Sequence, residues 1–418
     1  MTAGGTPRKI HYGWVIVAAG AMVLFACLGL ARFAFGMILP SMQVGLSLSP
    51  DRMGFIGTGN FIGYLASVLV SPLLLRRFQP RPTIAAGLFL IALCMLGISR
   101  ADSLVTICLL YGIVGLGSGF ANIPMMALVS YWFHSEQRGR AAGLIIAGNG
   151  CAIIFAGFFI PFLNRLHGAE GWRDSWQWLG LITLAAAVCA VLLLRNNPSE
   201  LGLEPVGRPA AVPKDLFNAP RQHKDGGILV CLGVLYMIFG VTFMVYGTFI
   251  VTTMVGEYGL DEQTAGLYWS WVGFFSLFSG VCFGALSDVI GRNRGIALVF
   301  AVQTAAYLLA GLKLGTAVLL VSIALYGLAV FAIPAIMAAA MGDYLGLSRA
   351  ASAFATVTIF FAIGQAIGPS AAGLIAKATG SFTTAYLAAG LLTGVAAVLA
   401  ACLPAPARLA GSQQDAKG

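Results

Sequence analysis

The sequence predicts an all-α membrane protein in which twelve transmembrane helices form two pseudo-symmetric six-helix bundles. Of the 418 residues, 59% are hydrophobic and only 9% are charged, and the mean hydropathy is +0.89. A water-soluble fold usually has about a quarter of its residues charged. The apolar residues also come in twelve runs, each near the roughly 20 residues that a helix needs to cross the hydrocarbon core of a bilayer.

These runs give the expected positions of the helices. They are residues 13–39, 53–75, 83–99, 104–130, 141–163, 176–194, 227–253, 265–287, 295–311, 316–342, 350–376 and 382–403. Helices are favoured over strands because the runs are continuously apolar, whereas a membrane barrel strand alternates over about 10 residues. The first run is about twice as long as the apolar part of a cleavable signal peptide, and no small-residue cleavage site follows it. It is therefore expected to remain as a membrane helix.

The positions of the 24 Lys and Arg residues predict the orientation, because basic residues near helix ends are retained on the cytoplasmic side. With the N-terminus inside, only six fall in loops on the opposite side: Arg52, Arg100, Arg165, Arg173, Lys313 and Lys377. Both termini are therefore expected in the cytoplasm. The net charge of +9 follows from this asymmetry, so the lipid bilayer is an expected partner and a nucleic acid is not.

The longest polar stretch, residues 195–226, separates the first six runs from the last six. We expect an N-terminal six-helix bundle at residues 1–195, a cytoplasmic linker at 196–226, and a C-terminal six-helix bundle with a short cytoplasmic tail at 227–418. The halves also resemble each other, since Arg140-Ala-Ala-Gly143 opens the fifth run and Arg349-Ala-Ala-Ser352 opens the eleventh. Many membrane carriers are built from duplicated halves of this kind.

The sequence shows no pattern of catalytic or metal-binding residues. All eight Cys lie in or at the ends of apolar runs, and none forms a C-x-x-C pair or a His/Cys cluster with metal-binding spacing. No cofactor, metal or catalytic residue is therefore expected, and the chain is not expected to be an enzyme. A membrane enzyme or a non-transporting receptor is a less favoured alternative, because either would need a catalytic cluster or a domain outside the membrane.

One loop carries a family signature. Gly284-Ala-Leu-Ser-Asp288-Val-Ile-Gly291-Arg292 follows the eighth run and resembles Gly-x-x-x-Asp-Arg-x-Gly-Arg, the loop motif of the major facilitator superfamily. The resemblance implies the twelve-helix fold of that superfamily. It also assigns Gly284, Asp288, Gly291 and Arg292 to a loop that takes part in conformational switching. The copy of the motif that the family has after its second helix is degraded here, with Leu75 in the place of Asp.

Further segments narrow the resemblance. They are His11-Tyr-Gly-Trp14, Gly117-x-Gly119-x-x-Asn122-x-Pro124, Tyr131-Trp-Phe133 and Asn197-Pro-Ser-Glu-x-Gly202. Together they resemble the bacterial monocarboxylate and oxalate/formate carrier branch. This implies secondary transport of a small carboxylate across the bacterial inner membrane by alternating access, often with a proton. Animal monocarboxylate carriers place a binding Arg on the eighth helix, whereas residues 265–287 contain neither Lys nor Arg.

Arg32 is the one basic residue inside any predicted span, and all fifteen acidic residues lie in loops, tails or span ends. A guanidinium in hydrocarbon costs several kcal/mol unless something compensates its charge. Its planar fork matches a carboxylate, so a small organic anion is the expected partner. Two alternatives stay open. In the first, Arg32 reaches the outer headgroups, although it stands eight residues before Pro40, about 12 Å along a helix. In the second, Arg32 donates hydrogen bonds to protein oxygens.

Other polar residues are expected to share the substrate site. On the spans that the resemblance places around a central cavity, Asn60, Tyr64, Tyr246, Tyr326 and Gln365 lie near the depth of Arg32, and Asn122 and Asn149 lie nearer the cytoplasm. Amides and phenols at these positions would orient a carboxylate or close the cavity. For each of them the alternative is a hydrogen bond between helices, worth about 0.6 kcal/mol in membranes.

The sequence leaves the coupling open. The four His residues lie in loops, and the nearest acids, Asp288 and Asp343, lie at cytoplasmic helix ends, so no dedicated proton relay is expected within the membrane. The anion would move alone, with a proton on its own carboxyl group, or in exchange for a second anion. A drug exporter of the same fold is the main alternative function, although exporters of cations usually contain a membrane-embedded acid. The carrier is expected to be a monomer.

Glycine and proline predict details of the helices. Gly115, Gly117 and Gly119 recur at alternate positions of the fourth run, where small residues allow close helix packing. Pro124, Pro334 and Pro369 are expected to kink their helices, because proline cannot donate the backbone hydrogen bond of a helix interior.

Overall fold

The computed structural model describes residues 11–207 and 225–404, and within these ranges the chain is almost entirely helical. Twelve helices are long and apolar enough to cross a membrane, which confirms the predicted fold class and number of spans. No strand occurs in the two described ranges, where a single parallel bridge joins Phe133 and Val206.

The elements follow one another along the chain. They are α1 (Tyr12–Leu24), η1 (Phe25–Phe33), α2 (Ala34–Gly45), α3 (Pro50–Arg77), α4 (Pro80–Ile98), α5 (Leu104–Trp132), α6 (Ser135–His167), η2 (Gly168–Glu170), α7 (Gly171–Leu193), η3 (Pro198–Leu201), α8 (Asp225–Gly256), α9 (Glu262–Ile290), α10 (Arg292–Gly311), α11 (Thr316–Ala329), α12 (Ala332–Leu345), α13 (Leu347–Thr379) and α14 (Thr383–Ala401). The first span is the continuous run of α1, η1 and α2, and the tenth consists of α11 and α12. Local sequence sets several starts: Pro50 and Pro80 occupy first-turn positions, and Asp261 caps α9 by accepting from the Thr264 N–H at 2.9 Å.

The first span is longer than the apolar run predicted. That run ends at Leu39, whereas the helix passes through Pro40 and ends at Gly45. The added turn is held by packing that hydropathy does not register: Met42 is fully buried, and the Trp176 indole N–H of α7 points at its sulfur at 3.3 Å. Contacts between helices therefore extend this helix past a proline.

The tenth span is interrupted, as its proline predicts. α11 ends at Ala329 and α12 begins at Ala332, because the Pro334 ring excludes a helical contact with the carbonyl of Val330, four residues earlier. The Phe331 N–H donates instead to the Ser279 hydroxyl of α9 at 3.0 Å. Pro124 and Pro369 lie inside helices that remain continuous.

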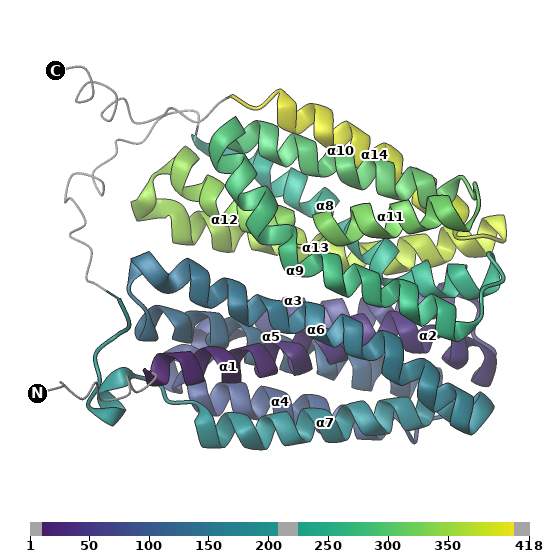
Figure 1. Ribbon diagram of the computed structural model, residues 1–418, viewed down its shortest axis with the longest axis horizontal. Coiled ribbons are helices and arrows are strands. Elements are labelled where there is room, and N and C mark those ends of the chain that lie inside the picture. The colour runs from purple at the N-terminus through teal and green to yellow at the C-terminus, as the bar shows by residue number, and fades with distance from the viewer. Residues whose placement is uncertain (1–10, 208–224, 405–418) are drawn as a thin grey trace, which may run out of the picture.

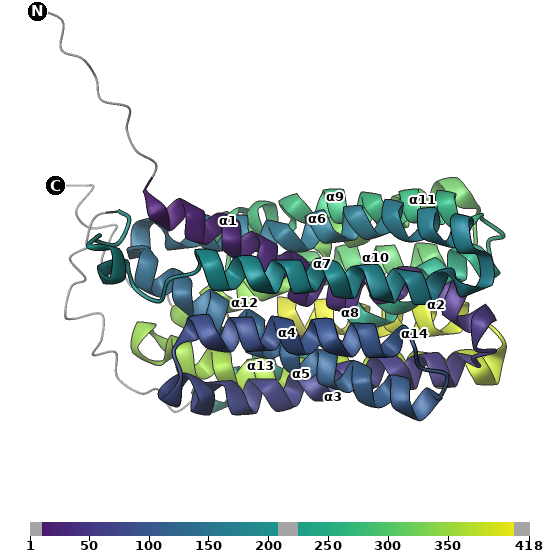
Figure 2. The same cartoon turned by 90° about the horizontal axis from the view of Figure 1, so that it is seen from below.

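The glycines of α5 allow three helices to approach closely, as predicted. A Cβ atom on Gly115 would lie 1.8 Å from the Asn60 carbonyl oxygen of α3, and one on Gly117 would lie 2.8 Å from the Gly87 carbonyl oxygen of α4. One on Gly119 would lie 1.6 Å from the Ser67 hydroxyl of α3. Figure 2 shows α3, α4 and α5 side by side. This packing sets how close α3 and α5 side chains come.

The helices gather into two bundles, α1 to α7 and α8 to α14, which meet along α2 with α8, α3 with α13, and α6 with α9. In Figure 1 the two sets of ribbons lie together at the right and diverge toward the left. The predicted boundaries at residues 195 and 227 lie close to the end of α7 at Leu193 and the start of α8 at Asp225. Most of the predicted linker lies outside the described residues, and the division into domains stays a prediction.

Polar contacts join the bundles near one end of the molecule. Lys377 of α13 pairs with Asp51 of α3 at 2.9 Å, and the Asn164 amide of α6 donates to Glu262 of α9 at 2.8 Å. Thr58 donates across the same interface to the Ala366 carbonyl at 2.7 Å. We call this end of the molecule the Asp51 end, and the opposite end, where α1 begins and α12 ends, the Arg292 end.

Candidate functional site

Arg32 lies in η1, a nine-residue π-helical segment in the middle of the first span, where the sequence predicts an ordinary helix. The wider turn of a π-helix changes the direction of the side chains that follow it, and such segments are frequent at functional sites. Helical side chains also lean toward the N-terminal end of their helix. Arg32 therefore leans away from the Asp51 end.

The guanidinium of Arg32 rests on two aromatic rings of α3. Its Cζ atom lies 3.9 Å from the centre of the Tyr64 ring and 4.9 Å from that of Phe61. Tyr64 stands 14 residues after Pro50 and 13 before Arg77, so it marks the middle of α3. The charged group is thus held at mid-span, and the alternative in which it reaches outer headgroups does not fit this geometry.

The charge of Arg32 has little compensation from the protein. Its Nε and Nη2 atoms are buried and have no hydrogen-bond partner, and no carboxylate of the described chain pairs with the group. A cation–π contact supplies about 0.5 to 2 kcal/mol, whereas withdrawing an ion from water costs several kcal/mol. Protein oxygens, the second alternative for this group, satisfy neither atom. The site therefore holds a positive charge that lacks an anion.

Asn122 of α5 extends the site. Its amide nitrogen donates to the Tyr64 hydroxyl at 3.2 Å. The absence of a side chain on Gly119 permits this contact, since a Cβ atom there would meet both Ser67 and the Tyr64 ring. Of the predicted residues, the structure thus brings together Arg32, Tyr64 and Asn122. With Phe61 they form what we call the Arg32 cluster.

Phe61 is absent from the predicted site. A large apolar residue within a membrane span carries no signal of its own, because most of its neighbours are apolar too. Its spacing of three residues from Tyr64 places both rings on one face of α3 and is the signal that identifies it.

Asn60 and Asn149 are buried outside the direct contacts of Arg32. The Asn60 amide donates to the Tyr111 carbonyl of α5 at 3.0 Å, which is the helix-to-helix bond that the sequence offered as its alternative role. Asn149 lies on α6 beside η1, where a Cβ atom on Gly29 would lie 3.7 Å from the Asn149 carbonyl. The side-chain oxygens of both residues are buried and have no partner. Their place in a substrate site stays a prediction.

The three predicted residues of the C-terminal bundle lie apart from the Arg32 cluster. Tyr246 bonds Ser322 at 2.8 Å, and Tyr326 donates to the Phe243 carbonyl at 2.9 Å, so both hydroxyls are engaged within that bundle. The two rings stack 4.1 Å apart and are fully buried. Gln365 is buried on α13 with its side-chain oxygen unpartnered. Contact with substrate stays a prediction for all three.

Aromatic rings join the bundles next to Arg32. Phe33, its neighbour in η1, meets Phe243 of α8 at 6.0 Å and Phe331 of the interrupted tenth span at 5.8 Å, both edge to face. The two bundles are therefore in contact one residue from the guanidinium.

The predicted switch loop forms a charge network at the Arg292 end. Arg292 pairs with Asp288 at 2.5 Å and with Asp343 of α12 at 2.6 Å, and it donates to the Ser287 hydroxyl at 2.7 Å. Gly291 has φ +98°, which favours glycine. No heavy atom lies within 4 Å of a Cβ atom built on Gly284. The loop thus ties α9 and α10 to α12, and its switching role stays a prediction.

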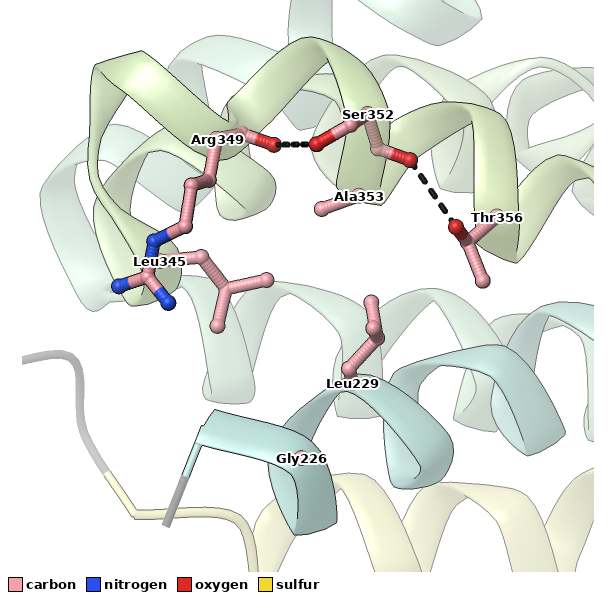
Figure 3. A pocket seen from close by; sticks show the side chains of 7 residues that line it. All are labelled: Gly226, Leu229, Leu345, Arg349, Ser352, Ala353 and Thr356. Atoms are coloured by element: carbon pink, nitrogen blue, oxygen red, sulfur yellow. Dashed lines mark hydrogen bonds between the residues drawn. The ribbon is translucent and has the colours of Figure 1, made fainter. Parts of the chain in front are cut away.

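A separate pocket of about 270 Å³ opens at the Arg292 end of the C-terminal bundle. It is lined by Gly226, Leu229, Leu345, Arg349, Ser352, Ala353 and Thr356 (Figure 3). The Ser352 and Thr356 hydroxyls donate to carbonyls of their own helix at 3.0 Å each. This pocket includes the second copy of the repeated Arg-Ala-Ala motif and none of the predicted substrate residues.

Comparison with known proteins is consistent with this architecture. Residues 24–403 match the family described as "Uncharacterised MFS-type transporter YbfB". Monocarboxylate transporter 2 of Rattus norvegicus is 24% identical over 413 residues, which cover 92% of this chain and 82% of that transporter. The hexuronate transporter of Bacillus subtilis (strain 168) is 24% identical over 403 residues, which cover 92% and 94%.

Solved structures show the same fold at low sequence identity. The D-xylose-proton symporter superposes with a TM-score of 0.75 at 17% identity, covering 95% of this chain and 98% of that one. A bacterial homologue of the human lysosomal transporter Spinster, inward-facing and unoccupied, superposes with a TM-score of 0.70 at 14% identity, covering 94% and 95%. The relatives are transporters and not enzymes. The chain therefore belongs to this family of MFS-type transporters, within the major facilitator superfamily.

Proposed function

We propose that this transporter carries a small organic anion across the bacterial inner membrane by alternating access, and that Arg32 binds the carboxylate of the substrate. The observation that carries the proposal is a mid-span guanidinium whose Nε and Nη2 atoms have no partner. These two nitrogens form one edge of the guanidinium, and a carboxylate binds such an edge through two parallel hydrogen bonds. An arriving anion would supply both bonds and the missing charge.

The names of two relatives support a carboxylate. One group transports monocarboxylates, and the other relative transports hexuronates, which are sugars that carry a carboxylate. The two cargoes differ in size and hydroxylation and share that group. A carboxylate-binding Arg suits both. Other parts of the site would recognise the rest of the substrate.

The contacts between the bundles support alternating access. They lie toward the Asp51 end, where α3 meets α13 and α6 meets α9. The excess of basic residues in loops supports a cytoplasmic Arg292 end, and this conformation would then be closed to the outside. The Arg32 edge is buried here, and the side chain must swing or the bundles must move to admit a carboxylate.

Ligand-dependent stabilisation of the purified protein tests the proposal. A bound ligand raises the unfolding temperature in proportion to the logarithm of its excess over Kd. We expect L-lactate or D-glucuronate to stabilise the wild-type protein, and lactamide, glucuronamide and glucose to have no effect. Arg32→Ala should abolish the response to the acids, whereas Arg100→Gln, which removes an exposed loop charge, should keep it.

Transport by the same variants completes the test. Proteoliposomes that contain wild-type protein should take up the stabilising acid, and those with Arg32→Ala should not. Counterflow that is independent of a clamped pH would indicate anion exchange, and uptake driven by a pH gradient would indicate movement with a proton. An Arg32→Ala protein that binds and transports acids like the wild type would refute the proposed site.

A further inference from the structure

We propose that the Tyr64 hydroxyl is a second donor to the substrate carboxylate and lets the carrier reject the corresponding amide. This inference rests on the proposed function of Arg32. It adds a specificity-determining residue on α3 and a positioning residue, Asn122, on α5.

The hydrogen bond between Asn122 and Tyr64 has a defined direction. Asn122 donates its amide hydrogen to the Tyr64 oxygen at 3.2 Å, so that oxygen acts as acceptor. A phenol has one hydrogen of its own to donate, and the described chain offers this hydrogen no acceptor. The residue is nevertheless buried, with 8% of its surface exposed, and the bond from Asn122 is partly buried. A buried donor without an acceptor is unfavourable, and a ligand oxygen would satisfy it.

The position of the hydroxyl relative to Arg32 identifies the ligand group. The guanidinium lies over the face of the Tyr64 ring, 3.9 Å from its centre, and the hydroxyl projects from the edge of the same ring. The two donors are therefore a few ångströms apart. A carboxylate has two oxygens that accept hydrogen bonds, so it can take bonds from Arg32 with one or both and from Tyr64 with the other.

The same arrangement excludes an amide. A carboxamide has one accepting oxygen, and its NH2 group can only donate. Asn122 already donates to the Tyr64 oxygen, so this NH2 would have to compete with it for that oxygen, and Arg32 has donors only. An amide would leave at least one buried donor facing another donor. Sites that hydrogen-bond a particular group reject analogues lacking it more strongly than apolar pockets do.

Tyr64→Phe tests the hydroxyl directly, because it keeps the ring that supports Arg32. We expect the Kd for the stabilising acid, L-lactate or D-glucuronate, to rise about tenfold or more, as is typical when one hydrogen bond to a charged group is lost. The preference for the acid over lactamide or glucuronamide should fall by the same factor. The unfolding temperature of the empty protein should change little. Tyr307→Phe is the matched control, since it removes a buried hydroxyl of α10 that has no hydrogen-bond partner.

Asn122→Ala tests the positioning role and carries the test if Tyr64→Phe folds poorly. We expect a smaller loss of acid affinity than with Tyr64→Phe, because the phenol then turns freely. In the Tyr64→Phe background the second change should have no further effect, since Asn122 acts through the hydroxyl.

The outcomes separate this inference from the proposed function. If Arg32→Ala loses acid binding while Tyr64→Phe keeps wild-type affinity and acid preference, the inference is overturned and the proposed function stands. The inference also fails if Asn122→Ala reduces acid affinity equally with and without the Tyr64 hydroxyl. If Arg32→Ala binds acids normally, the proposed function itself fails.

Discussion

At the scale of single residues, Arg32 is the side chain whose charge the described chain compensates least well. Arg32 is half-buried at mid-span, and its charge is offset by two aromatic rings and by no acid of the described chain. Arg173 provides the contrast. It also stacks on an aromatic ring, at 4.2 Å from Trp172, but it pairs with Asp102 and Glu170. Arg173 therefore has two acidic partners, whereas Arg32 has none in the described chain.

This contrast predicts opposite effects on stability. Arg32→Leu should raise the unfolding temperature of the empty protein, because a buried ion carries a desolvation penalty of several kcal/mol that an apolar side chain does not. Arg173→Leu should lower it, since two acids lose their partner. Thermal unfolding of both variants in detergent without ligand makes the comparison. A clear destabilisation by Arg32→Leu would show that the guanidinium is bound by the protein after all.

At the scale of elements, glycine sets how closely α3 and α5 approach and so places Tyr64 against Asn122. The Asn60 carbonyl occupies the space in which a side chain on Gly115 would begin. Gly139 of α6 is the opposite case, because no heavy atom lies within 4 Å of a Cβ atom built there.

Gly115→Ala is therefore expected to force α3 and α5 apart. Overpacking of this kind costs about 1 to 3 kcal/mol, and the unfolding temperature should fall. Binding of the acid should weaken as well, since Tyr64 and Asn122 lie further along the same interface. Gly139→Ala should be neutral or slightly stabilising, because alanine favours helix by about 1 kcal/mol over glycine. Equal effects of the two changes on stability would count against the packing explanation.

The sequence predicted the positions of the helices more completely than it predicted the candidate site. Hydropathy located all twelve spans because apolar length is a local property. It did not show the π-helical turn around Arg32 or the helix beyond Pro40, since these depend on contacts such as that of Met42 with Trp176. Arg32 stood out as a lone charge. Its support by Phe61 depends on how helices pack, and hydropathy contains no information about that.

At the scale of the whole molecule, the contacts between the bundles predict how the conformational equilibrium can be shifted. Lys377 and Asp51 pair between the bundles, whereas Lys313 pairs with Glu257 inside the C-terminal bundle. Lys377 is more than half exposed, and an exposed ion pair contributes up to about 1 kcal/mol. Such an amount changes the ratio of two conformations by up to about fivefold.

We expect Lys377→Gln to favour the conformation that is open at the Asp51 end. A thiol introduced by Thr58→Cys, at the interface between α3 and α13, should then react faster with a maleimide by about two- to fivefold. Lys313→Gln should leave the rate unchanged because its ion pair does not join the bundles. Peptide mapping separates the introduced thiol from the native cysteines. Equal rates in both variants would show that the Asp51–Lys377 pair does not hold this interface.

The central claim is that the unpartnered edge of Arg32 receives the carboxylate of the substrate. An experimental structure of the protein with bound D-glucuronate or L-lactate tests it most directly. The account predicts carboxylate oxygens within hydrogen-bond distance of Arg32 Nε and Nη2, with the Tyr64 hydroxyl donating to the same group. An acid bound elsewhere, with both nitrogens of Arg32 still unpartnered, would contradict it.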